Sequence, residues 1–158
     1  MALKLSSDLK NYIINAAIIK QLCGTLGTGG TGQIIIYSGS QPTDADQATN
    51  GSALCYIGGT AGLGVGWGGT GGANTTTGAT AGTAGIASTA GYVGTAINTG
   101  IAGWARFQCF GTNFLGTAAT FRLDGDVGTA STCVFVINST SIVAGALVTL
   151  LAAPISFP

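Results

Sequence analysis

Two pairs of aspartates are the residues of this sequence whose type and spacing could do chemistry. Asp44 and Asp46 lie in the polar stretch SGSQPTDAD, and Asp124 and Asp126 flank a glycine in FRLDGDVG. Clustered carboxylates can hold a hard cation such as Ca²⁺ or act as general acid and base. Neither stretch has the ligand register of an EF-hand, and turn aspartates usually hydrogen-bond their own backbone. We therefore expect a solvated turn at the first pair, a hairpin tip at the second, and no metal site.

Other catalytic arrangements are excluded by the residues that the chain lacks. The sequence contains no His and no Glu, so neither a Ser–His nor a Cys–His pair can be built. Residues 27–32 match a G-x-G-x-x-G pattern, but a nucleotide loop must follow a strand and open a helix, whereas this stretch follows a predicted helix. We expect no catalytic residue, no cofactor and no small-molecule substrate.

The four cysteines are the remaining reactive side chains: Cys23, Cys55, Cys109 and Cys133. They form no C-x-x-C motif, and a zinc site would need all four drawn together from distant segments. Three of them lie in predicted strands, where a thiol serves as a small buried hydrophobe. Disulfides stay open as the alternative, for a protein that leaves the reducing cytosol.

The aromatic residues offer one possible binding feature. Trp67, Trp104, Tyr56 and Tyr92 could stack against a sugar, as in carbohydrate-binding modules. Nothing in the spacing groups them on one face, and aromatic residues with few charges are also typical of a core or a protein interface. The sequence favours the core or interface role.

The charge content restricts the function further. Of 158 residues only five are basic and five acidic, which is 6% of the chain, where roughly 25% is usual. The net charge is zero, so the chain lacks the basic surface of a nucleic-acid binder or a membrane-surface helix. Zero net charge promotes association. We expect an assembly subunit that forms homo-oligomers.

Targeting and membrane segments are not predicted. The N-terminal stretch MALKLSSDLKNY has no apolar signal-peptide core. The longest apolar run, IVAGALVTLLAAP over residues 142–154, is shorter than the ~20 residues that span a bilayer. We expect synthesis in the cytoplasm without export.

The elements that position these residues begin with one amphipathic helix, from Ser6 or Ser7 to about Leu22. Serine is a good N-cap, Asp8 and Lys20 suit the helix dipole, and Gly24 can end the helix. One apolar stripe recurs at helical spacing, namely Leu9, Tyr12, Ile13, Ala16 and Ile19. The stripe can pack on the sheet of its own domain, which is the commoner case, or on a neighbouring subunit.

Short strands separated by glycine-rich turns follow the helix. Five runs have strand patterns, and the ATFRL stretch before Asp124 adds a sixth: Gln33–Ser38, Ala53–Ile57, Gly103–Phe110, Thr132–Asn138 and Ala146–Ala152. In the third run Ala105, Phe107 and Cys109 alternate with Arg106 and Gln108, so the two sets should face opposite sides. The segment 58–102 is rich in Gly and Thr, and disorder, a long loop or short strands ordered by neighbours are all open there; we favour the third.

Together these elements predict a mainly β fold: an antiparallel β-sandwich or jelly-roll-like domain with one N-terminal helix. The whole chain, 1–158, is expected to be one domain. Its parts are the helix at 1–24, the first strands at 33–57, the Gly/Thr-rich segment at 58–102, and the C-terminal strands and tail at 103–158.

Four stretches in the same order resemble a signature of small structural proteins encoded by tailed bacteriophages. They are LSSDLKN (5–11), IIIYSGSQPTDADQA followed by GSALCYI (34–57), GIAGWARFQCF (100–110) and FRLDGDVGTAS (121–131). The match runs collinearly from about residue 5 to residue 150, apart from the Gly/Thr-rich middle. The cysteines are not part of this signature.

The resemblance implies a non-enzymatic virion protein, with a head cement or decoration protein as the expected role. Such a protein would assemble in the bacterial host cytoplasm, lie on the capsid surface and bind the major capsid protein. The alternative is a tail or fibre accessory protein that binds host glycans. Apolar residues near the exposed ends are the interface candidates: Leu9, Tyr12, Ile13, Ile19, Trp67, Ile155 and Phe157.

Overall fold

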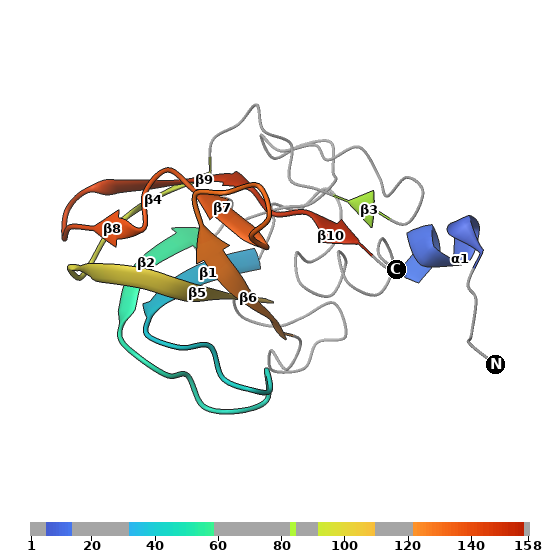
Figure 1. Cartoon of the computed structure of the whole chain (residues 1–158), viewed down its shortest axis with the longest axis horizontal. Helices are drawn as coiled ribbons and strands as arrows, with labels where there is room; N and C mark the ends of the chain where they lie inside the picture. Colours follow the sequence, from blue (N-terminus) through green and yellow to red (C-terminus); the bar gives the residue numbers. More distant parts are fainter. Residues whose placement is uncertain (1–5, 14–31, 59–82, 85–91, 110–121, 157–158) are drawn as a thin grey trace.

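The computed structural model of the chain describes residues 6–13, 32–58, 83–84, 92–109 and 122–156. These residues contain one short helix and ten strands (Figure 1). The elements are α1 (Ser7–Tyr12), β1 (Gly32–Ser38), β2 (Ala53–Gly58), β3 (Thr83–Ala84), β4 (Tyr92–Thr95), β5 (Gly100–Cys109), β6 (Arg122–Gly128), β7 (Phe135–Ile137), β8 (Ser141–Ile142), β9 (Leu147–Ala152) and β10 (Ile155–Ser156).

The helix begins where the sequence predicts. The Leu9 backbone N–H donates to the Ser6 side-chain oxygen at 3.3 Å, so Ser6 is the N-cap, and Asp8 lies in the first turn. The rest of the predicted helix, residues 14–22, lies outside the described residues. Among those that are described, no helix has the length and apolar character needed to cross a membrane.

Seven strands form one nearly closed, barrel-like sheet in the order β2-β1-β5-β6-β7-β9-β4, and β8 pairs with the start of β5. The circle nearly closes where β4 returns to β2, through a bridge between Cys55 and Ala96 and a 2.8 Å hydrogen bond from Ile97 N to Leu54 O. No helix belongs to this barrel. The predicted mainly β fold is confirmed.

The finer prediction of an antiparallel sandwich needs correction. The described strands continue around a single sheet, and β6 and β7 pair in parallel, with Val127 opposite Phe135 and Gly128 opposite Val136. A parallel pair usually needs a connection of a dozen or more residues. Here residues 129–134 suffice because only the last two residues of β6 take part in the pairing.

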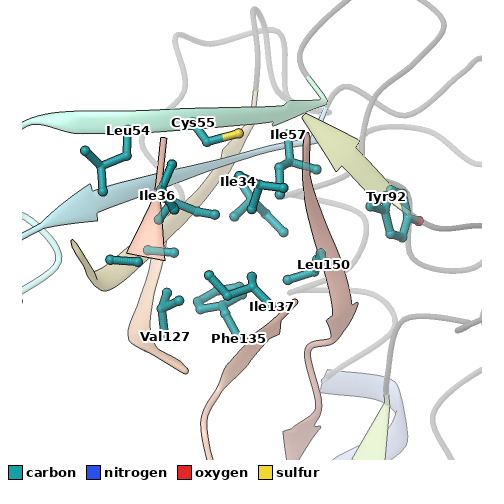
Figure 2. Close-up of a cluster of buried hydrophobic side chains, with 14 of the residues drawn as sticks. Ile34, Ile36, Leu54, Cys55, Ile57, Tyr92, Val127, Phe135, Ile137 and Leu150 are labelled. Carbon is teal, nitrogen blue, oxygen red and sulfur yellow. The ribbon is translucent and has the colours of Figure 1, made fainter. Parts of the chain in front are cut away.

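The barrel interior is filled by side chains that alternate along the strands (Figure 2). Ile34 and Ile36 point inward from β1 and pack with residues of β2, β5, β6, β7 and β9; Phe107 and Phe135 are the largest fully buried residues of this core. Ala105 and Phe107 lie inside while Arg106 lies on the outer face, as the alternation in this strand predicts. The buried strand predicted at 33–38 is confirmed.

The hairpin tip predicted at Asp124–Asp126 is wrong, because these residues lie inside β6 and pair with β5. Gly125 does not provide a turn there. A Cβ at this position would lie 2.6 Å from Val134 Cγ1 and 3.0 Å from Phe135 Cε2. The glycine therefore leaves the space that Phe135 occupies in the core.

Part of the Gly/Thr-rich middle is ordered by its own chain. β4 falls within the 58–102 segment and pairs along its length with β9, from Tyr92 opposite Leu150 to Thr95 opposite Leu147. β3 pairs with β10 in a separate two-stranded sheet. Residues 59–82 and 85–91 lie outside the described part of the chain.

Candidate functional site

A cluster of aromatic and charged side chains lies on the outer face of β1, β5 and β6. It consists of Tyr37, Trp104, Arg106 and Asp124, and we call it the outer cluster. Strand register brings these residues together, because Tyr37 is opposite Trp104 and Arg106 is opposite Asp124. Residues two apart on a strand share a face, so Trp104 and Arg106 stand side by side.

The geometry of the outer cluster is tight. The Tyr37 and Trp104 rings stack with centroids 4.5 Å apart and planes at 13°, and the Arg106 guanidinium carbon lies 5.5 Å from the centroid of the Trp104 ring. Arg106 donates Nε to Asp124 Oδ1 at 2.8 Å and Nη2 to Oδ2 at 2.7 Å. Both side chains of this bidentate pair are almost fully buried, at 4% and 3% exposure. The hydrogen bonds that Arg106 donates to Asp124 raise the pKa of Arg106.

The loop between β1 and β2, residues 39–52, covers this cluster, and we call it the covering loop. Side chains of the sheet donate hydrogen bonds to backbone carbonyls of this loop. Trp104 Nε1 donates to Asn50 O at 3.2 Å, both Arg106 Nη atoms to Gln47 O at 3.3 Å, and Arg122 Nη1 to Ala45 O at 3.2 Å. The loop begins and ends at glycines with φ near +79°, where a side chain would be strained. The side chains of the sheet therefore bind the loop through its backbone carbonyls.

The aspartates serve the fold. Asp44 Oδ1 accepts from Asp46 N at 2.9 Å, and both residues are exposed, which confirms the solvated turn predicted here. Asp126 Oδ1 accepts from Val134 N at 2.9 Å, next to the parallel β6–β7 pair. Within the described ranges, no group of three or more His, Cys, Asp or Glu residues could hold a metal ion.

Comparisons of the chain with protein-family models, with curated proteins and with solved structures found no match.

Three of the four sequence stretches 5–11, 34–57, 100–110 and 121–131 meet at the outer cluster. The IIIYSGSQPTDADQA stretch supplies Tyr37 and most of the covering loop. GIAGWARFQCF supplies Trp104 and Arg106, and FRLDGDVGTAS supplies Asp124. Strand pairing thus joins stretches of sequence that are up to about ninety residues apart into one structural unit.

The aromatic residues do not form a sugar platform in the described part of the chain. Trp104 and Tyr92 are buried, whereas Tyr56 is exposed on β2. Trp67 lies outside the described residues. The core role that the sequence favours is confirmed for Trp104 and Tyr92.

Two cysteines are free thiols in the structure. Cys55 is buried in the core, and burial raises its pKa to about 11, whereas Cys133 is half-buried. Cys109 lies in β5 opposite Gly32, and Cys23 lies outside the described residues. The prediction of a small buried hydrophobe is confirmed for Cys55.

The interface residues predicted from the sequence remain predictions. Leu9 and Tyr12 are exposed on α1 and Ile13 is half-buried, so the first two are accessible to a partner. Ile155 lies in β10, opposite Ala84. Ile19, Trp67 and Phe157 lie outside the described residues.

A surface that the sequence analysis did not identify lies over β4, β9, the start of β5 and the turn between β8 and β9. Six of the large exposed hydrophobic residues of the described chain fall in the segments 93–101 and 143–151, and we call this surface the apolar wall: Val93, Ile97, Ile101, Val143, Leu147 and Leu151. The sequence carried one usable signal, because neither segment contains a charged residue. Which hydrophobic residues of these strands face outward is decided only by strand register.

Proposed function

We propose that this chain is a non-enzymatic structural protein of a tailed-bacteriophage virion: a head cement or decoration protein that binds the major capsid protein on the shell surface. It would assemble in the bacterial host cytoplasm and act as one copy among many.

The proposal rests on the four collinear sequence stretches that resemble the signature of phage structural proteins. In the fold, the residues of three of these stretches build the outer cluster and the loop that covers it. Stretches whose residues contact one another in the fold support the proposal better than isolated motif matches would. The barrel would take the place of the sandwich that the resemblance implies.

The chemistry of the described residues supports a role without catalysis. Asp124 is bound by Arg106, Asp44 accepts from its own turn, and Asp126 accepts from Val134 N. The sequence has no His to act as a general base. Each of these carboxylates thus has a structural role that accounts for it.

Cementing needs surface area, not reactive groups. A decoration subunit binds through many individually weak contacts, and repetition over a shell multiplies their effect. The covering loop suits this role. Hydrogen bonds from side chains of the sheet hold its backbone, while its residues at 43, 44 and 46–50 remain exposed.

The test is co-sedimentation of the purified chain with shells of the encoding phage that lack it. We expect saturable binding to mature shells, in proportion to the number of capsomers, and weaker binding to pre-expanded shells. Isolated tails of the same phage are the matched control. Binding to tails alone, or to neither particle, would contradict the proposal, and a positive glycan array would favour the accessory role instead.

A further inference from the structure

The apolar wall is carried by segments of the chain that are paired with one another. Ile101 and Leu147 are 65% and 64% exposed. The two segments that carry the wall are joined by the β4–β9 and β5–β8 pairs, with a 3.0 Å hydrogen bond from Ala144 N to Thr99 Oγ1 and a 2.8 Å bond from Gly145 N to Ala96 O. Exposed apolar patches of this kind on ordered strands mark interaction sites.

Charge is absent from this side of the barrel. No charged residue occurs between Asp46 and Arg106 or after Asp126. All six charged residues of the barrel strands and their described loops lie in the covering loop, β5 or β6. Figure 1 shows the loop between β1 and β2 below the barrel and β4 and β9 along its upper side. The described barrel therefore has a charged side and an uncharged side.

We propose that the apolar wall is the contact between two copies of this chain. A charged partner surface would lose its hydration there without gaining a counter-charge, so charge complementarity favours an uncharged occupant. A second copy presents such a surface, and in an isologous contact the same apolar wall lies on both sides. Interfaces between identical subunits are also the more apolar class.

This pairing is independent of capsid binding. It uses the uncharged side of the barrel and leaves the covering loop exposed for another partner. If the protein pairs in solution but does not bind capsids, this inference stands and the proposed function is contradicted.

The test is sedimentation velocity of the full chain over a range of concentrations. We expect the wild-type chain to associate, and expect Ile101→Asp and Leu147→Asp each to raise the dissociation constant at least ~100-fold, because each places a carboxylate inside an apolar contact. Ala48→Asp is the matched control: it adds the same charge at an exposed position of the covering loop, and it should leave the dissociation constant unchanged.

Circular dichroism establishes that each variant is folded. If an aspartate variant fails this check, Thr95→Glu replaces it, since Thr95 is exposed and lies opposite Leu147. A wild-type chain that stays monomeric at about 100 µM would overturn the pairing. Aspartate variants that associate as the wild type does would also overturn it. The same holds if the Ala48→Asp control raises the dissociation constant as much as the aspartate variants do. Wild-type monomers whose capsid binding is lost in Leu147→Asp would assign the wall to the capsid instead.

Discussion

Arg106 links three parts of the molecule through one side chain. Its guanidinium pairs with Asp124 on β6, lies over the Trp104 ring on its own strand, and donates to Gln47 O in the covering loop. Arginine suits this position because its planar fork can serve a carboxylate and a carbonyl together, whereas a lysine ammonium has no such fixed geometry.

Asp124→Asn should destabilise the fold strongly. The substitution removes the counter-charge of a buried arginine, and breaking a buried pair in this way costs about 3–5 kcal/mol. Urea unfolding followed by circular dichroism measures the free-energy change. Asp126→Asn is the matched control, because that residue is exposed and its amide oxygen can still accept from Val134 N. Equal losses in the two variants would show that the buried pair has no special role.

The buried thiol of Cys55 predicts a loss of stability at alkaline pH. Its pKa rises from an ordinary value of 9.0 to about 11 by burial, so the folded state keeps a proton that the unfolded state releases. This contribution is fully present below pH 9 and is lost as the pH rises toward 11. The raised pKa of Tyr37, also caused mainly by burial, adds to the same decline.

The measurement is the slope of the unfolding free energy against pH between 9 and 11. The ordinary and the raised pKa of Cys55 set this window. Cys55→Ala should show a shallower fall than the wild type, although the cavity lowers its stability at every pH. Identical slopes would contradict the assignment to Cys55.

At the scale of elements, the barrel closes where β4 meets β2, and a glycine permits the contact. A Cβ at Gly94 would lie 2.2 Å from Tyr56 O and 2.8 Å from Cys55 Sγ. In the described residues, the Cys55–Ala96 bridge and the hydrogen bond from Ile97 N to Leu54 O join this end of β4 to β2, so close backbone approach has to replace a full ladder of hydrogen bonds.

Gly94→Ala should therefore weaken the contact between β4 and β2, which we call the seam of the barrel. Forcing an extra methyl group into a filled site typically costs about 1–3 kcal/mol. Hydrogen exchange is the sharper measurement, because amides of β4 should lose protection before those of β1 and β5. Thr95→Ala, one residue along and exposed, is the control that should change little. Uniform loss of protection over all strands would argue against a local seam.

The covering loop predicts a negative result with calcium. The Asp44 carboxylate already accepts from Asp46 N, and both side chains are exposed in a turn that lacks further clustered ligands. Calorimetric titration with Ca²⁺ should show no tight binding, and Asp44→Ala should cost only about 1 kcal/mol through the lost turn hydrogen bond. Stoichiometric, tight binding would restore the metal site that we reject.

At the scale of the whole molecule, charge is divided between two sides of the barrel. A contact built from the uncharged side should respond to salt as hydrophobic contacts do. Self-association should change little when NaCl rises from about 50 to about 500 mM, since no exposed charge pair is screened. Sulfate should strengthen it, because it is excluded from protein surfaces. Sedimentation at each salt concentration is the measurement, and dissociation by NaCl would indicate an electrostatic contact instead.

The sequence predicted the local features well. Alternation in 103–110 separated core from outer face, the three isoleucines marked a buried strand, and Ser6 marked a helix start. The sequence did not predict which distant residues contact one another in the fold. Asp124-Gly125-Asp126 looked like a tight turn, yet these residues lie within a strand because they pair with Trp104, Ala105 and Arg106 of β5, about twenty residues earlier in the chain.

The sequence by itself determined the composition, the scarcity of charge, the strand-forming runs and the absence of His and Glu, because these depend on residue types and short-range spacing. Tertiary structure alone decided that the runs form one nearly closed barrel and that Asp124 is buried against Arg106. It also decided that six hydrophobic residues of the β4 and β9 region face outward. Strand register determines all three, because a shift of one residue would turn each side chain to the opposite face.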